Sequence, residues 1–142
     1  MKRLILLIMT CIPLLCVAQD QALMEKYSSI DGCATIELSK EMIRSMGGGD
    51  GIDTLSAISI ESEALISDFN KEVAEYAKGM TQILSVIQNS QRVKIYCVVD
   101  DNTNKITKML IHTTDSHKAV MVVLTGKDIE ISNVSSIMDM NI

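Results

Sequence analysis

Alternating apolar and polar positions dominate the second half of the chain and predict four consecutive strands. The alternating segments span residues 82–88, 92–99, 105–113 and 118–125. Short segments rich in Asn, Asp and Ser separate them, as turns between antiparallel strands do. The last segment is apolar on both faces from Ala119 to Leu124, which indicates a central or covered strand.

The second of these strands has two faces of different character. One face carries Val93, Ile95, Cys97 and Val99, whereas the other carries Arg92, Lys94 and Tyr96. Such alternation is typical of an antiparallel strand that is buried on one side only.

A long amphipathic helix is predicted immediately before the strands, from Glu63 to Met80. Its apolar residues recur at intervals of three and four, which places them on one core-facing stripe. They are Leu65, Ile66, Phe69, Val73, Tyr76, Ala77 and Met80. The opposite face is charged, and we expect it to be solvated.

The first half of the chain predicts shorter elements. In chain order they are a helix at 21–29, a strand at 33–38, a helix at 40–46 and a strand at 54–61. The glycine-rich segment 47–51 is expected to be a loop, and 131–138 to be a last short helix.

These elements predict a single α+β domain over residues 19–142. We expect a mainly antiparallel sheet, largely a C-terminal four-stranded meander, with the one long helix and the short helices packed on one face. About 120 residues can bury a core without a structural metal or several disulfides.

Residues 1–18 have the pattern of a secretory signal peptide. Lys2 and Arg3 precede an uncharged, almost wholly apolar run over 4–17, which is shorter than the roughly 20 residues of a membrane-spanning helix. Small residues before Gln19 predict cleavage after Ala18. We therefore expect an exported protein in the periplasm or cell envelope of a Gram-negative bacterium, with no transmembrane segment in the mature chain.

A lipid anchor at Cys16 is the competing interpretation of the same segment. Lipoprotein signals place a small residue just before the cysteine, and here Leu15 stands there. The sequence therefore argues against lipidation.

Charge excludes some partners of the mature chain. Removal of residues 1–18 leaves 11 basic and 18 acidic residues, a net charge of −7. Nucleic acids and anionic membrane surfaces attract clusters of Lys and Arg, and only Arg44 and Arg92 remain as arginines. We therefore expect no nucleic-acid partner.

Several of these segments together make the mature chain resemble the DUF4252 family of exported bacterial proteins of unknown function. The resemblance is carried by Tyr27, Ile36–Met42, Leu55–Ile60, the helix at 63–80, Val93–Tyr96 and Val123–Gly126 with Ile129. It extends over nearly all of residues 20–140, with Gly47–Gly51 as a local departure. It implies an exported α+β domain and supplies no catalytic residues.

Cys33 and Cys97 are the two cysteines left after cleavage, so an exported chain presents them as a candidate disulfide. Their strand parities argue against the bridge. Cys97 is expected on the core-facing side of its strand with Ile95, whereas Cys33 is expected on the outward-facing side of its strand with Thr35 and Glu37. A buried Cys97 acting as a small apolar residue is the alternative.

A copper site is a second chemical hypothesis, because His112 and His117 lie near Met109 and Met121 and soft Met/His sites suit copper. Met109 and His112 are three apart in one strand, however, and so point to opposite faces. No other metal site and no cofactor is predicted.

Catalytic motifs of the common hydrolase, metalloprotease and thiol types do not occur. The sequence therefore favours a non-catalytic interaction or binding module for an unknown envelope protein or small ligand, acting by edge-strand pairing or through a small cleft between helix and sheet. The alternative is a small enzyme whose site gathers the dispersed residues Glu37, Tyr96, Asp100 and His112.

Overall fold

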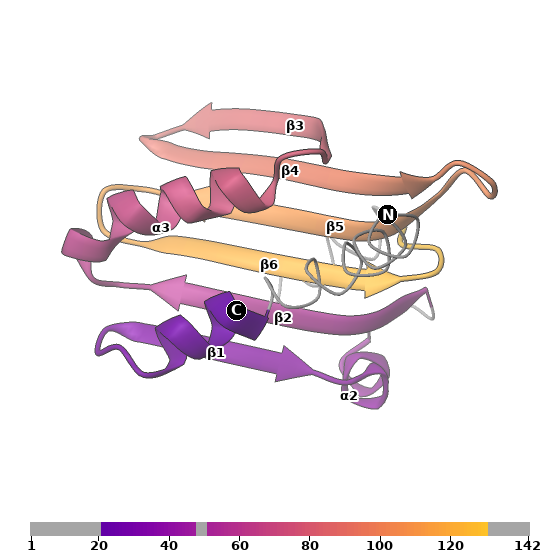
Figure 1. The fold of residues 1–142 in the computed structure, drawn as a ribbon, viewed down its shortest axis with the longest axis horizontal. Coiled ribbons are helices and arrows are strands. Elements are labelled where there is room, and N and C mark those ends of the chain that lie inside the picture. The colour runs from indigo at the N-terminus through magenta and orange to yellow at the C-terminus, as the bar shows by residue number, and fades with distance from the viewer. Residues whose placement is uncertain (1–20, 48–50, 131–142) are drawn as a thin grey trace, which may run out of the picture.

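Six antiparallel strands form the sheet on which the helices pack. The computed structural model describes residues 21–47 and 51–130, and within them the strand order is β1-β2-β6-β5-β4-β3 (Figure 1). The strands are β1 Cys33–Leu38, β2 Ile52–Ile60, β3 Thr81–Gln88, β4 Gln91–Asp100, β5 Lys105–Thr114 and β6 Ala119–Gly126. The expectation of an α+β fold with an antiparallel sheet is confirmed.

The last four strands are sequential neighbours, as the alternating pattern predicts. Strand β6 then pairs with β2 on its other side, so that β6 lies inside the sheet. This position explains why Ala119–Leu124 is apolar on both faces, because both faces of a central strand are covered.

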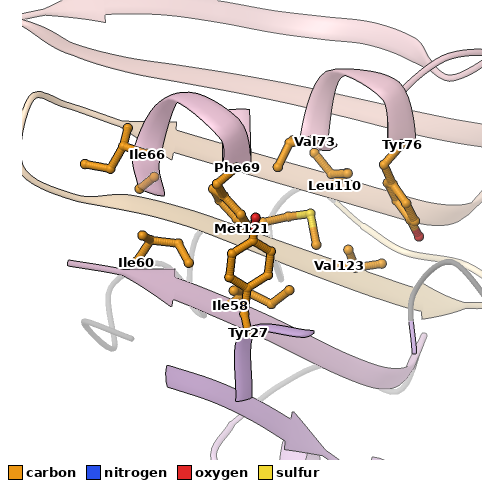
Figure 2. Packing of buried hydrophobic residues seen from close by; sticks show 11 residues of the cluster. Tyr27, Ile58, Ile60, Ile66, Phe69, Val73, Tyr76, Leu110, Met121 and Val123 are labelled. Atoms are coloured by element: carbon orange, nitrogen blue, oxygen red, sulfur yellow. The ribbon is translucent and has the colours of Figure 1, made fainter. Parts of the chain in front are cut away.

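Helix α3 (Glu63–Tyr76) lies across one face of the sheet (Figure 1). Its Phe69 and Val73 are fully buried against Ile58 of β2 and Met121 of β6 (Figure 2). Residues 21–28, also helical, add Tyr27, whose ring meets that of Phe69 edge-on with centroids 5.2 Å apart. These contacts form the first core cluster, the apolar layer between α3 and the sheet.

The opposite face of the sheet carries a second core cluster. Leu55 and Ala57 of β2 point to this side, because they alternate with Ile58 and Ile60 of the first cluster. Ile43 of the short helix α2 (Lys40–Ser45) packs here. The expectation that all helices share one face is therefore corrected: α2 covers the other face.

Helix α3 also ends earlier than its apolar spacing predicts. Ala77 caps it, and Gly79 has a φ of +85°, which turns the chain toward β3. The signal sequence 1–18 and the predicted helix at 131–138 lie outside the described residues, as does most of the loop 47–51. Among the helices that are described, none is both long and apolar enough to cross a membrane.

Gly126 closes the contact between the end of β6 and the start of β2. A Cβ atom on Gly126 would lie 1.9 Å from the carbonyl oxygen of Gly51. We expect Gly126→Ala to lower the free energy of unfolding by about 2 kcal/mol, because backbone atoms must move to relieve the overlap. Urea denaturation measures this change. The control Thr103→Ala, in the exposed turn between β4 and β5, is expected to change stability by less than about 0.5 kcal/mol. Equal effects of the two variants would contradict the packing argument.

Candidate functional site

A polar cleft opens between helix α3 and strands β4 and β5. Its volume is about 140 Å³. The lining residues are Asn70, Val73 and Ala74 from α3, Arg92, Lys94 and Tyr96 from β4, and His112 and Thr114 from β5. The cleft lies on the same face of the sheet as the first core cluster, beside the apolar layer.

Strand pairing brings the polar side chains of the cleft together. Lys94 is the register partner of His112, and Arg92 is the partner of Thr114. Register partners in antiparallel strands project to the same face, and so do residues two apart in one strand. The side chains that alternate along β4 and β5 therefore form one polar surface beneath the helix.

Asn70 connects the helix to this surface through two hydrogen bonds. Its Oδ1 atom lies 2.9 Å from Nε2 of His112, and its Nδ2 donates to Oγ1 of Thr114 at 3.3 Å. Because an amide oxygen only accepts, Nε2 of His112 carries the proton of the neutral ring. Asn70, His112 and Thr114 thus fix the position of α3 relative to β5.

His112 is nine-tenths buried and uncharged at neutral pH. Burial, with the positive charge of Lys94 as the second cause, lowers the pKa of His112 to about 4. A buried imidazolium loses hydration that Asn70 alone does not replace. The ring therefore acts as a neutral hydrogen-bonding group.

Arg92 and Lys94 give the cleft its charge. Neither side chain forms an ion pair with a carboxylate within the part of the chain that the structure describes, and no Asp or Glu lines the cleft. Lys40, Lys78 and Lys105, in contrast, are paired with Asp53, Glu75 and Asp128. The cleft is thus a positive site on an acidic chain, whose net charge is −5.

The structure brings together two of the four residues of the enzyme hypothesis. Tyr96 and His112 line the cleft. Glu37 lies on β1, at the other edge of the sheet, and Asp100 lies at the end of β4, where its carboxylate accepts from the backbone N–H of Asn102.

The site residues predicted from the sequence do not include Asn70, Arg92, Lys94 or Thr114. The polar face of the strand at 92–99 was a usable signal, because it placed Arg92, Lys94 and Tyr96 together. The position of Asn70 above that face depends on how α3 packs, which no local pattern encodes.

The two cysteines lie far apart. Cys33 is on β1 and Cys97 on β4, with three strands between them, and both are free thiols. Four strand spacings amount to roughly 19 Å, whereas a disulfide needs Cα atoms within about 7 Å. They also occupy opposite faces, since Cys33 packs on the first cluster and Cys97 shares the face of Ile95. The arrangement excludes the candidate bridge within one chain, and burial raises the pKa of both thiols.

The histidines and methionines of the copper hypothesis are divided between two faces and two environments. Met121 is the register partner of His112, but Met109 packs in the second core cluster, on the other face. His117 is exposed and contacts Glu63 through Nδ1. Within the described residues no three His, Cys, Asp or Glu side chains come together as a metal-binding group.

The fold and the cleft define a small α+β domain with one sheet and a polar pocket beside its main helix. Residues 27–137 match the family described as Domain of unknown function (DUF4252). The chain belongs to this family, and the resemblance is confirmed. No curated protein and no solved structure matches the chain significantly.

The low pKa of His112 makes stability depend on pH. The unfolded chain binds a proton at this residue near pH 6.5, whereas the folded chain resists protonation until about pH 4. The contribution of the neutral ring is therefore complete above pH 6.5 and is lost as pH falls toward 4, about 2 to 3 kcal/mol by pH 4.5.

Urea unfolding at pH 7 and pH 4.5 tests this dependence. We expect His112→Gln to lose less stability than the wild type between the two pH values, because glutamine does not titrate. The matched variant His117→Gln keeps His112 and should keep this component. An undiminished loss in His112→Gln would show that other groups cause the pH dependence.

Proposed function

We propose that the chain is a non-catalytic binding module that takes a small anionic ligand, a carboxylate or a phosphate, in the cleft beneath α3. The observation that carries this proposal is the pair of cations, Arg92 and Lys94, without an ion-pair partner among the described residues. Unpaired cations that share a concave site favour an anion, because its charge replaces the missing counterion.

The donors that line the cleft suit oxygen atoms. Arg92 offers a planar guanidinium that can hold two oxygens, Lys94 offers an ammonium group, and Tyr96 offers a hydroxyl. His112 and Asn70 satisfy each other at the inner wall. A ligand would therefore bind mainly through β4 while resting against a preformed wall.

The volume limits the size of the ligand. The volume of about 140 Å³ leaves room for a few water-sized groups. A phosphate ion or a short carboxylic acid fits this space, whereas a nucleotide or a peptide would extend well outside it.

The chemistry of the lining supports binding rather than catalysis. The cleft contains two cations, a phenol, an amide, a neutral imidazole and one threonine hydroxyl. Nε2 of His112 donates its proton to Asn70, and none of the described carboxylates lines the cleft to orient the ring as a general base. Glu37 and Asp100, which the enzyme alternative requires, lie elsewhere on the sheet.

We also propose that the chain is exported and cleaved after Ala18. The positive start at Lys2 and Arg3 and the short apolar run support this. The intact mass of protein isolated from the cell envelope should equal that of residues 19–142 without an added lipid. A mass that includes residues 1–18, or that carries acyl chains on Cys16, would contradict the proposal.

Titration with inorganic phosphate and with acetate tests the cleft. Amide signals of β4 and of Asn70 should shift on addition of at least one of these anions in two-dimensional NMR. We expect Lys94→Gln or Arg92→Gln to weaken binding by about tenfold or more, because each removes a charge-assisted hydrogen bond. Added salt should weaken binding in the wild type as well.

The matched control is Lys105→Gln, which removes one positive charge at a lysine paired with Asp128 and outside the cleft lining. It should bind the anion as the wild type does. Equal weakening in Lys105→Gln and Lys94→Gln would indicate non-specific charge attraction, and no shift with either anion would reject the proposed ligand class.

A further inference from the structure

Among the described residues, strand β3 is a sheet edge that no other element covers, and its composition is unusual. All eight of its residues, Thr81–Gln88, are exposed, and none of them is charged. Ile83, Leu84, Val86 and Ile87 have exposed fractions of 39 to 70%. Proteins normally protect an edge strand with Lys, Pro or a cover, since its free N–H and C=O groups pair readily with another strand.

The opposite edge of the sheet lacks these properties. Strand β1 has six residues, carries Glu37, and is followed directly by α2. Only β3 therefore offers a long, uncharged backbone edge within the described residues.

The sequence of β3 is nearly the same in both directions. From Gln82 to Gln88 it runs Gln-Ile-Leu-Ser-Val-Ile-Gln, with Ser85 at its centre. In an antiparallel pair of identical strands, centred on Ser85, each residue meets the one at the same distance from the centre. Ile83 then lies opposite Ile87 of the second copy, and Leu84 opposite Val86.

We infer that β3 is a self-association edge: two copies of this chain pair antiparallel through β3, about a two-fold axis at Ser85, and join their sheets into one. An isologous interface requires a surface that complements itself, and this strand does so residue by residue. Apolar pairs across such strands are favourable, and no charge opposes the contact. This inference is independent of the proposed anion site.

The two faces of the joined sheet agree with this register. Leu84 and Val86 are partners of Ile95 and Val93 in β4, so they extend the apolar face of the second core cluster to the edge. In the dimer the Leu84–Val86 contacts would occur twice, once on each side of the axis, and would continue that face across the interface.

The register irregularity in β3 lies at one end of the pairing segment. It falls between Gln82 and Leu84, and from Leu84 to Gln88 the pairing with β4 is regular. Leu84–Val86, the three residues at the two-fold axis, are therefore regular in both copies, and the irregularity lies only where the ends of the two strands meet.

Sedimentation equilibrium of the purified protein tests the association. The wild type should reach a mass of two chains as concentration rises. Val86→Lys should raise the dissociation constant by at least about tenfold, because the substitution places an ammonium group opposite Leu84 twice in each dimer. The control Ile36→Lys changes a residue of nearly equal exposure, 40% against 39%, on the other edge, and should leave the dimer unchanged.

A charge exchange at Ser85 tests the register itself. Ser85→Lys and Ser85→Glu should each be monomeric alone, because identical charges face each other at the axis. An equimolar mixture should form a heterodimer, detected by native mass spectrometry. Circular dichroism of both variants establishes that they fold.

Three results would overturn the inference. The first is a wild type that stays monomeric at its highest soluble concentration. The second is a larger assembly that Ile36→Lys disperses, since this would indicate pairing of β3 with β1 of the next copy. The third is a Ser85→Lys and Ser85→Glu mixture that remains monomeric while the wild type dimerises, since this would reject the two-fold axis at Ser85.

Discussion

The placement of helix α3 on strands β2 and β6 determines what the rest of the sheet can do. Phe69 and Val73 anchor the helix over these strands, and Tyr27 closes the contact from the side. A single fourteen-residue helix cannot cover six strands. The part of the same face formed by β3 and β4 is therefore left accessible, and the polar cleft lies where the helix meets it. The free edge has a separate cause, the position of β3 at the end of the strand order.

Local periodicity is sufficient to predict most of the elements. The predicted strand at 33–38 coincides with β1. The apolar run at Ala119–Leu124 indicates the central position of β6, because a strand that is buried on both faces has apolar residues at successive positions. The apolar spacing predicts too late an end for α3, because Met80 continues the spacing although the chain turns at Gly79.

Tertiary placement explains what the sequence pattern does not predict. Ile43 has the spacing of a core residue, but nothing local determines that its helix packs on the face opposite α3. Likewise, nothing in the sequence near Asn70 indicates that this polar helix residue contacts His112 and Thr114. The sequence shows the alternation of Arg92, Lys94 and Tyr96 and predicts the helix, but it does not predict that the helix lies beside these residues.

The tyrosines occupy three distinct environments, and the chain has no tryptophan. Tyr27 is buried and donates to Glu72 at 2.9 Å, Tyr76 lies with the ammonium of Lys108 4.6 Å from its ring centre, and Tyr96 lines the cleft. Burial and Glu72 raise the pKa of Tyr27. The intrinsic ultraviolet emission of the protein consequently comes from three phenols in chemically different surroundings, one beside a carboxylate, one beside an ammonium group and one in the cleft, with no indole to mask them.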